Sequence, residues 1–304
     1  MPQHTYLVTG CTGFIGGAIA RALVQAGQVV HGTSRSATPA GPAGVTMHAC
    51  DLLDDAAVET LLEVVRPTHL VHAAWDVTHN VYWTSPANLA WLAASVRLLD
   101  AFRRAEGQRA VGVGTCAEYA VTPDPCHETE SKLDPATPYG RCKYALFEAF
   151  QAAAQMGLST AWGRLFFPYG TGDGQRRFLP SLTRALVAGN AFDMSPGTQL
   201  LDFIHISDVG AAFAQLTASR VTGAVNIASG EGTALRDIAL RAAEALGRDP
   251  AILRFGALPM RATDPIALVA DTTRLREDVG FRPRIPWRLG IGCFAQGIEP
   301  EPVA

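Results

Sequence analysis

The sequence contains no long hydrophobic run, no paired cysteine motif and little excess charge of either sign. No uninterrupted apolar stretch approaches the ~20 residues needed to cross a bilayer. Residues 1–9 carry neither a basic region nor a cleavage site for secretion. The six cysteines are scattered without a C-x-x-C pair, which favours free thiols over disulfides or a zinc knuckle. We therefore expect a cytoplasmic protein with no membrane segment and no bound metal.

The charge balance limits the kinds of partner. The chain has 25 Lys and Arg against 28 Asp and Glu, a formal net charge of −3. A near-neutral surface gives no electrostatic reason to expect binding to nucleic acid or to a membrane. Hydrophobic residues make up 48% of the 304 residues, which excludes a mainly disordered chain. The length indicates one large or two small globular domains.

The first half of the chain alternates short β-rich runs with amphipathic helical stretches. Such alternation predicts right-handed crossovers and a parallel sheet covered on both faces, an α/β fold of the Rossmann-type, doubly wound kind. We expect strands at residues 6–8, 28–32, 45–49, 68–72, 110–114 and 159–165, and helices at 13–27, 53–66, 86–106 and 138–156.

Beyond residue 165 the regular alternation of strands and helices ends, and loops rich in Gly and Pro separate shorter elements. We predict a dinucleotide-binding domain over residues 1–165 and a smaller C-terminal α/β lobe that binds substrate over residues 166–304. Residues near 202–227 are expected to return to the sheet, so that the two domains are interleaved.

A glycine pattern follows the first expected strand, in Thr9-Gly10-Cys11-Thr12-Gly13-Phe14-Ile15-Gly16. Gly10 allows a tight turn, Gly13 lets the backbone approach a pyrophosphate, and Gly16 permits close packing of helix on strand. The helix that starts here offers free N–H groups and a positive dipole end to phosphates. The alternative is an ordinary turn. The strand–loop–helix context favours dinucleotide binding by Gly10, Thr12, Gly13, Phe14, Ile15 and Gly16.

The end of the second strand bears on which nicotinamide cofactor binds. An acid there would bond the ribose hydroxyls of NAD, but the chain has Thr33-Ser34-Arg35-Ser36. Arg35 can pair with a 2′-phosphate and Ser34 can donate to it, although a solvated surface arginine is the alternative. We therefore favour NADP, with NAD possible. Asp51, beside Leu52, either contacts the adenine or caps the next helix.

Tyr139 and Lys143 stand four residues apart at an expected helix start, so both side chains lie on one helix face. A nearby Lys143 would lower the phenol pKa of Tyr139. Tyr139 could then exchange a proton with a substrate oxygen while hydride passes to or from nicotinamide. A tyrosine and a lysine four residues apart often occur by chance. The pair is informative here because it lies downstream of the glycine loop in an α/β chain.

With these motifs the chain resembles the extended short-chain dehydrogenase/reductase family, in its branch of nucleotide-sugar epimerases, dehydratases and reductases. The resemblance covers nearly the whole length. Its further motifs are His72-Ala73-Ala74, Asn88, Thr115, residues 164–170, residues 202–205 and residues 225–230.

The resemblance implies roles for particular residues. Thr115 matches the residue that hydrogen-bonds the reacting oxygen, Tyr139 the acid/base, and Lys143 the residue that holds the nicotinamide ribose. Asn88 matches an asparagine that positions the catalytic site, and His72, Ala73 and Ala74 match a cofactor-binding stretch. It also implies a nucleotide-sugar substrate and a homodimer formed through the helices that carry Lys143 and Asn88.

The substrate-binding residues depart from the family pattern at two positions. Arg261 matches an arginine that grips the nucleotide diphosphate, and Arg176 and Arg177 either add charge there or begin a solvated helix. Relatives have asparagine at the position of Phe167 and arginine at the position of Leu201. The diphosphate grip is therefore weaker or rebuilt, and a smaller or less charged carbonyl substrate stays an alternative.

The residues after Thr115 bear on the reaction. Dehydratases of the family carry an acid just after this threonine, whereas here Cys116-Ala117 follow and Glu118 comes one position late, on the other face of an extended segment. We favour a reductase of a nucleotide-activated 4-keto-sugar that uses NADPH. The main alternative is an NAD-dependent nucleotide-sugar 4-epimerase. A dehydratase, or a non-catalytic regulator that senses NADP(H), is disfavoured.

Overall fold

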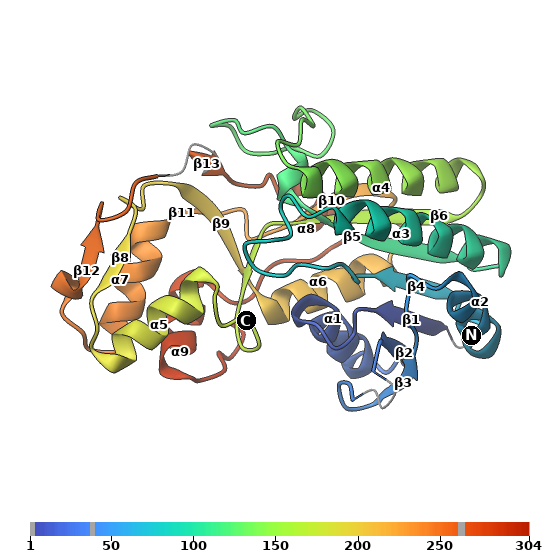
Figure 1. Ribbon diagram of the computed structural model, residues 1–304, viewed down its shortest axis with the longest axis horizontal. Helices are drawn as coiled ribbons and strands as arrows, with labels where there is room; N and C mark the ends of the chain where they lie inside the picture. Colours follow the sequence, from blue (N-terminus) through green and yellow to red (C-terminus); the bar gives the residue numbers. More distant parts are fainter. Residues whose placement is uncertain (1–3, 37–39, 261–264, 304) are drawn as a thin grey trace.

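The computed structural model describes residues 4–36, 40–260 and 265–303. A large sheet with helices on both faces forms one side of the molecule, and a smaller group of strands and helices forms the other (Figure 1). The first is built mostly from the N-terminal part of the chain, with α6 (Ile206–Ala218) and β10 (Gly223–Ile227) added from the C-terminal part, and the second is built mostly from the C-terminal part. The arrangement confirms the predicted α/β fold.

The large sheet has seven strands, and every neighbouring pair is parallel. In spatial order the strands are β10 (Gly223–Ile227), β6 (Ser159–Leu165), β5 (Arg109–Thr115), β4 (His69–His72), β1 (Thr5–Thr9), β2 (Val29–Ser34) and β3 (Val45–Ala49). The chain moves outward from β1 to β3 and then returns to β4 on the other side of β1. At such a switch point the carboxyl ends of neighbouring strands open a crevice for a ligand.

Helices cover the large sheet on both faces (Figure 1). On one face lie α1 (Phe14–Gln25) and α6 (Ile206–Ala218), and on the other α2 (Asp55–Val65), α3 (Ala87–Arg104) and α4 (Pro138–Gln155). The side chains of β1 show why, since Tyr6 and Val8 are buried in the cluster with α1 and α6, and Leu7 in the cluster with α2, α3 and α4. Strands that are apolar on both faces require this double cover.

The smaller region contains short strands packed against helices. Its strands are β7 (Phe167–Tyr169), β8 (Phe192–Met194), β9 (Leu200–His205), β11 (Gly232–Ala234), β12 (Leu253–Phe255) and β13 (Ala267–Leu268). Its helices are α5 (Phe178–Ala188), α7 (Leu235–Ala245) and α9 (Trp287–Gln296), and its 3-10 turn is η2 (Pro250–Ile252). The short helix α8 (Thr273–Glu277) packs on β10 of the large sheet, and the 3-10 turn η1 (Cys116–Glu118) directly follows β5. β9 pairs with β7, β11 and β13, while β8 pairs with β12.

The expected return of residues 202–227 to the large sheet holds only for β10. β10 pairs with β6 along its whole length, from Gly223 against Ala161 to Ile227 against Leu165. β9 instead lies in the second sheet, because the chain leaves the large sheet after β6 and β7 offers β9 a parallel partner. The division into domains at residue 165 stays a prediction.

The second strand is longer at its carboxyl end than the sequence pattern indicates. β2 ends at Ser34 instead of residue 32, because β3 continues to pair with it until Ser34 meets Ala49. This extension places Ser34 and Arg35 at the edge of the sheet, where the ligand crevice opens.

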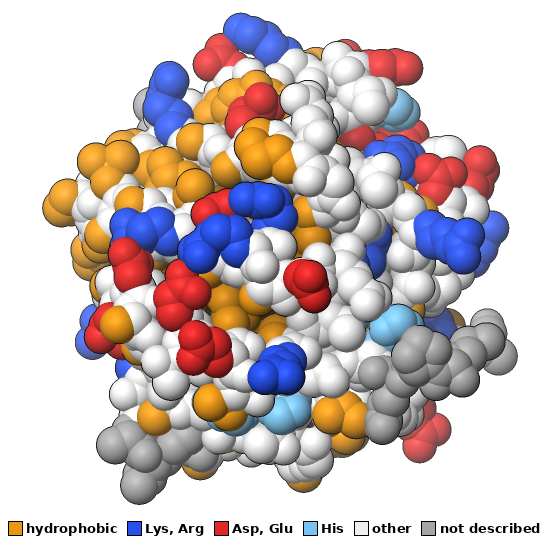
Figure 2. Space-filling view, turned by 90° about the vertical axis from the view of Figure 1, so that its right-hand side faces the viewer, with side chains coloured by type: hydrophobic (Ala, Val, Ile, Leu, Met, Phe, Trp, Pro, Cys, Tyr) orange, Lys and Arg blue, Asp and Glu red, His pale blue; other side chains and the backbone are white. Residues whose placement is uncertain are grey.

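The surface near α2 carries charges of both signs. Ion pairs join α3 to α2 through Arg97 with Asp55 and Arg104 with Glu59, and Figure 2 shows basic and acidic side chains interspersed at this end of the molecule. Exposed pairs of this kind add little stability. All six cysteines are free, as predicted. Among the described residues, no helix combines the length and the apolar character that crossing a membrane requires.

Candidate active site

The glycine loop packs tightly between β1, β4 and α1. Gly10 has a φ of +67°, and a Cβ there would lie 2.9 Å from the Cα of Ala74. A Cβ on Gly16 would lie 2.3 Å from the carbonyl oxygen of Gly10. Any side chain at either position would therefore separate helix α1 from the strand ends.

The N-terminus of α1 is open to an anion. Gly13 is its N-cap and supplies no side-chain acceptor, and the first turn contains no acid. A surface hollow of about 330 Å³ lies beside this helix end, lined by Cys11, Thr12, Gly13, Gly17, Arg21, Ala40, Gly41 and Pro42. Free backbone N–H groups, the helix dipole and the Arg21 guanidinium suit a phosphate group. These residues fit the pyrophosphate of a dinucleotide.

A buried chain of hydrogen bonds ties the glycine loop to the end of β4. Thr9 Oγ1 accepts from the N–H groups of Ala73 (3.1 Å) and Ala74 (3.2 Å). The His72 ring lies 2.8 Å from Thr9 Oγ1 through Nδ1 and 2.8 Å from Ser95 Oγ through Nε2. Burial lowers the pKa of His72 to about 3, so this ring is neutral. Its side chain positions the loop, and contact of this stretch with a cofactor stays a prediction.

The residues expected to surround the adenosine lie at the ends of β2 and β3. Arg35 is exposed, and Ser34 Oγ accepts from the N–H of Ser36 (3.2 Å). Asp51 is exposed and accepts from the N–H of Leu53 (3.1 Å), while Leu52 is buried.

The capping role considered for Asp51 is wrong. Asp54 caps α2 by accepting from the N–H groups of Ala56 and Ala57, because a turn after Asp51 starts the helix later than the pattern indicated. The contact of Asp51 with adenine stays a prediction.

The start of α4 brings Tyr139 next to Thr115. Thr137 caps this helix by accepting from the N–H of Gly140 (3.1 Å). A Cβ on Gly140 would lie 2.6 Å from the carbonyl oxygen of Ala117, so glycine lets the helix start rest on η1. The Thr115 side chain lies near enough to the Tyr139 phenol to act on its pKa, in the direction that lowers it. Two residues predicted to act on the same substrate oxygen are thus neighbours.

Three aromatic side chains surround the Tyr139 ring. Tyr82, Trp83 and Trp75 meet it edge to face, with ring centroids at 4.9, 5.5 and 6.3 Å. Burial raises the pKa of Tyr139, the neighbouring Tyr82 raises it further, and the nearby Thr115 side chain offsets this only in part. At neutral pH the phenol therefore holds its proton.

Lys143 lies one turn from Tyr139 and is directed at a different set of partners. Its Nζ donates to the carbonyl oxygen of Val113 (3.0 Å) and lies 4.1 Å from the centroid of a Trp75 ring. Burial lowers the pKa of Lys143 to about 7. The Tyr139 pKa is therefore raised and not lowered as expected, because burial dominates and the Lys143 ammonium is directed at Val113 and Trp75.

Asn88 holds the aromatic loop in place. Its Oδ1 accepts from Trp75 Nε1 (2.8 Å), and its Nδ2 donates to the carbonyl oxygens of Tyr82 (2.7 Å) and Ser85 (2.9 Å). Asn88 is buried and its amide is engaged at both ends. Its predicted role at the catalytic site is thus compatible with positioning rather than with contact to substrate.

Glu118 is directed away from this group into the core. Its carboxylate accepts from the Thr115 N–H (2.9 Å), from Trp162 Nε1 (2.9 Å) and from Arg164 Nε (2.8 Å). The side chains of Glu118 and Arg164 are both fully buried. A carboxylate held by so many donors cannot take a proton from substrate, which agrees with the reasoning that disfavoured a dehydratase.

The predicted substrate arginines differ in their surroundings. Arg177 pairs with Asp173, Nε to Oδ1 at 3.3 Å. Burial raises the pKa of Tyr82, and the positive charge of Arg177 partly offsets this rise. Arg177 is therefore close enough to Tyr82 to influence its phenol electrostatically. Arg176 is exposed, and Arg261 lies outside the described residues.

The two positions that depart from the family pattern are apolar in their surroundings. Leu201 is buried in the hydrophobic cluster of the smaller region, and the Phe167 ring packs on Phe203 with centroids 5.9 Å apart. A phosphate group therefore finds no polar partner in either side chain.

Sequence reasoning missed three residues of this site. Thr9 has only one signal, a hydroxyl directly before the glycine loop. Trp75 and Tyr82 lie in a segment dense in aromatics, a composition that core packing explains equally well. Nothing in the spacing of Trp75 and Tyr82 indicates that they meet Tyr139 and Lys143, because these partners belong to α4, far along the chain.

A glycine loop at the exit of β1 and a Thr–Tyr–Lys group at the exit of β5 occupy the same edge of a parallel sheet. This arrangement defines a class, the Rossmann-fold enzymes that use a nicotinamide dinucleotide. Within that class, the chain belongs to the NAD dependent epimerase/dehydratase family, whose model matches residues 6–228.

Known proteins that the chain resembles include epimerases and reductases. It is 27% identical to a UDP-glucose 4-epimerase of Streptomyces lividans, over 91% of both chains. It is 25% identical to a dTDP-4-dehydro-6-deoxy-D-allose reductase of Streptomyces bikiniensis, over 95% of this chain and 94% of that one. The crystal structure of a Thermus thermophilus UDP-glucose 4-epimerase in complex with NAD matches with a TM-score of 0.85 at 26% identity, over 96% of this chain and 98% of that one.

Proposed function

We propose that the protein is an NADPH-dependent reductase of a nucleotide-activated 4-keto-sugar. The observation that carries this proposal is the end of β2, where Ser34 and an exposed Arg35 stand at the position of the acid that binds the ribose of NAD. Arg35 suits the 2′-phosphate of NADP. A reductase relative that matches 95% of the chain supports the same reaction.

The cofactor is held by the switch point of the large sheet. The N–H groups of Thr12, Phe14 and Ile15 would hold the pyrophosphate, and Gly13, whose own N–H donates to the carbonyl oxygen of Gly10 (2.9 Å), would let the loop approach it. Ser34 and Arg35 would hold the 2′-phosphate, and Asp51 and Leu52 the adenine. Ala73 and Ala74 line its path toward Tyr139 and Lys143, which bind the nicotinamide ribose. A bound nicotinamide supplies the hydride for reduction of a carbonyl.

The protein's own residues supply the proton. Tyr139 is protonated at neutral pH and lies beside Thr115, so its hydroxyl can give a proton to the carbonyl oxygen that is being reduced. The Thr115 hydroxyl donates a second hydrogen bond to the same oxygen. The aromatic rings over Tyr139 exclude water from this transfer.

The substrate enters from the smaller region of the molecule. Arg176, Arg177 and Arg261 provide the positive charge for a nucleotide diphosphate. The apolar surroundings of Leu201 and Phe167 make this grip weaker than in relatives that have arginine and asparagine there. A homodimer would form through α3 and α4, where Leu89 and Val96 expose apolar side chains.

A second candidate function is an NAD-dependent nucleotide-sugar 4-epimerase. UDP-glucose 4-epimerases are prominent among the relatives and structural neighbours. An epimerase would use Thr115, Tyr139 and Lys143 in the same way, with a retained NAD and room for the keto intermediate to rotate.

The experiment follows nicotinamide absorbance with a panel of 4-keto-sugar nucleotides. We expect net oxidation of NADPH with kcat/KM well above that for NADH. Arg35→Ala should raise KM for NADPH about tenfold to a hundredfold and leave NADH nearly unchanged, since a charge-assisted bond to the 2′-phosphate is lost. Arg220→Ala, another exposed arginine, at the amino end of β10, serves as the control.

Two results contradict the proposal. Interconversion of two sugar nucleotides without net NADPH oxidation would assign the protein to the epimerases. Equal use of NADH and NADPH by Arg35→Ala and by the wild type would remove Arg35 from cofactor choice.

A further inference from the structure

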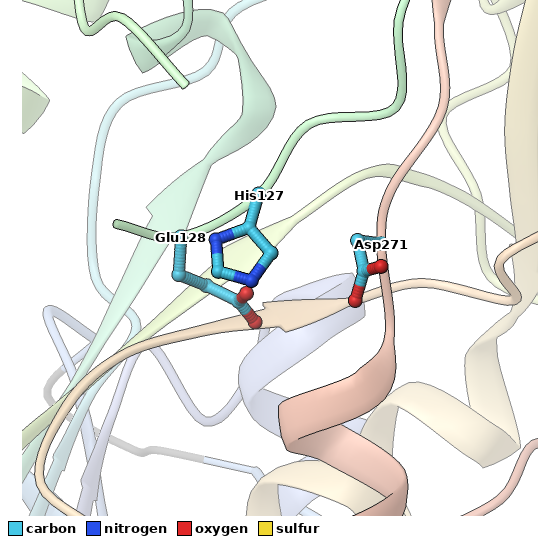
Figure 3. Close-up of side chains that lie close together, drawn as sticks. All are labelled: His127, Glu128 and Asp271. Carbon is cyan, nitrogen blue, oxygen red and sulfur yellow. The ribbon is translucent and has the colours of Figure 1, made fainter. Parts of the chain in front are cut away.

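Three potential metal ligands meet away from the candidate active site. His127 and Glu128 lie in the segment between η1 and α4, and Asp271 lies just before α8. One ligand atom from each lies within 4.8 Å of the others. Figure 3 shows the Glu128 carboxylate next to the His127 ring, with the Asp271 carboxylate across from both. Nothing in the sequence pattern joins Asp271 to the adjacent pair His127 and Glu128, which lies far from it along the chain.

Glu128 provides an independent sign that this cluster can bind a ligand. The residue is only 5% exposed, and its Oε1 accepts from the N–H of Asn226 (2.8 Å). Its Oε2 is buried and has no hydrogen-bond partner among the described residues. A buried carboxylate oxygen without a partner is destabilising, whereas a cation bound to it removes that cost.

The other two side chains are oriented by their own hydrogen bonds. His127 Nδ1 lies 3.3 Å from Thr129 Oγ1 and 3.4 Å from the Thr129 N–H nitrogen. In the tautomer whose Nδ1–H donates to Oγ1, Nε2 is the ligand atom. Asp271 Oδ1 accepts from the N–H of Thr273 (2.7 Å), which leaves its other oxygen free for a cation. Metal ligands are commonly oriented by a second bond of this kind.

The backbone fixes the two segments against each other. Cys126 donates to the carbonyl oxygen of Val269 (2.7 Å) and accepts from the N–H of Asp271 (2.9 Å). The Asn226 amide donates to the carbonyl oxygens of Cys126 (2.7 Å) and Asp271 (3.0 Å). The ligands are therefore brought together by the fold before any ion binds.

We propose that His127, Glu128 and Asp271 form a binding site for a divalent transition-metal ion of the Zn²⁺ type. One imidazole nitrogen with two carboxylate oxygens suits such an ion better than Mg²⁺ or Ca²⁺, which prefer oxygen ligands alone. Bonds of about 2.1 Å require only modest rotation of side chains that are already this close. The ion clips the segment before α4 to the segment before α8, beside β10, and takes no part in the Tyr139 chemistry.

The test measures Zn²⁺ binding to the EDTA-treated full-length protein by calorimetry and by thermal unfolding. We expect about one Zn²⁺ per chain and a rise in Tm, as for any ion that binds only the folded state. Mg²⁺ should bind at least about tenfold more weakly. His127→Gln should weaken Zn²⁺ binding at least about tenfold. Glu128→Gln, which keeps the acceptor for the Asn226 N–H, should do the same.

His48→Ala is the matched control, because His31 Nδ1 and His48 Nε2 lie 2.8 Å apart and form another place where imidazoles meet. This variant should bind Zn²⁺ as the wild type does. Circular dichroism checks that each variant is folded. Zn²⁺ binding that survives in both His127→Gln and Glu128→Gln, binding lost in His48→Ala instead, or an absence of saturable binding to the wild type would each overturn the site.

Discussion

At the residue scale, burial shifts the pKa values of Tyr139 and Lys143 in opposite directions. A phenol buried under three aromatic rings loses solvation as an anion, so its pKa rises and it keeps its proton. Lys143 next to it loses solvation as a cation, and its pKa falls to about 7. At neutral pH the phenol is therefore protonated and Lys143 is only partly protonated, so Tyr139 carries the proton that reduction of a carbonyl oxygen requires.

We predict that Tyr139→Phe lowers turnover about 10²- to 10⁴-fold, the usual contribution of a positioned acid. The ring packing stays, because phenylalanine lacks only the hydroxyl, so the affinity for NADPH should change little. Steady-state kinetics and a fluorescence titration with NADPH measure the two quantities. Tyr144→Phe, a half-buried tyrosine on the same helix, is the control. Unchanged turnover in Tyr139→Phe would favour a non-catalytic sensor of NADP(H).

At the scale of elements, the segment between β4 and α3 forms a cover over the active-site end of α4. Trp75 at its start packs on Lys143, and Trp83 near its end accepts from the Tyr139 N–H through its carbonyl oxygen (3.1 Å). Asn88, in the first turn of α3, holds both parts. One buried amide thus joins a helix, a loop and the catalytic group.

We predict that Asn88→Ala lowers the free energy of unfolding by about 1–3 kcal/mol, because buried polar groups of Trp75, Tyr82 and Ser85 lose their partner. The loosened loop should also shift tryptophan emission to longer wavelength and reduce kcat/KM. Urea unfolding, emission spectra and kinetics measure these effects. Asn190→Ala, which removes the amide of an exposed asparagine just after α5, should change none of them. A variant that is less stable but unchanged in emission and kinetics would leave Asn88 a purely structural residue.

At the scale of the whole molecule, histidines kept neutral by burial make stability depend on pH. The pKa of His69 is lowered to about 4 and that of His72 to about 3, in each case mainly by burial. Below their ordinary value of 6.5 the unfolded chain takes up protons that the folded protein refuses. Stability therefore falls as the pH falls from 6.5 toward these lowered values. Asp202, with its pKa raised by burial to about 6, acts in the opposite direction.

We predict that His72→Asn flattens this pH dependence. Asparagine keeps a polar group near Thr9 and Ser95 but does not titrate, so the fall in unfolding free energy between pH 7 and about pH 4 should be smaller than in the wild type. Urea unfolding at a series of pH values measures the slope. Identical slopes would show that His72 is not the neutral buried group described here.

Local features of the fold and site could be predicted from the sequence. The expected strand 159–165 coincides with β6, and the expected strand 45–49 with β3. The glycine loop stands where the pattern placed it, and Tyr139 and Lys143 share one face of α4. These features depend on residues a few positions apart, whose geometry is set by strand pleat, helix pitch and the conformations open to glycine.

The tertiary structure alone decided the contacts between distant segments. It assigned β9 to the second sheet, put Trp75 over Lys143, paired Glu118 with Arg164 and brought Glu128 to Asp271. It also reversed the expected pKa shift of Tyr139, since burial arises from elements that pack together only in the folded chain. Spacing along the chain determines which side chains share a face, whereas packing of the whole molecule determines what that face meets and how far it is removed from water.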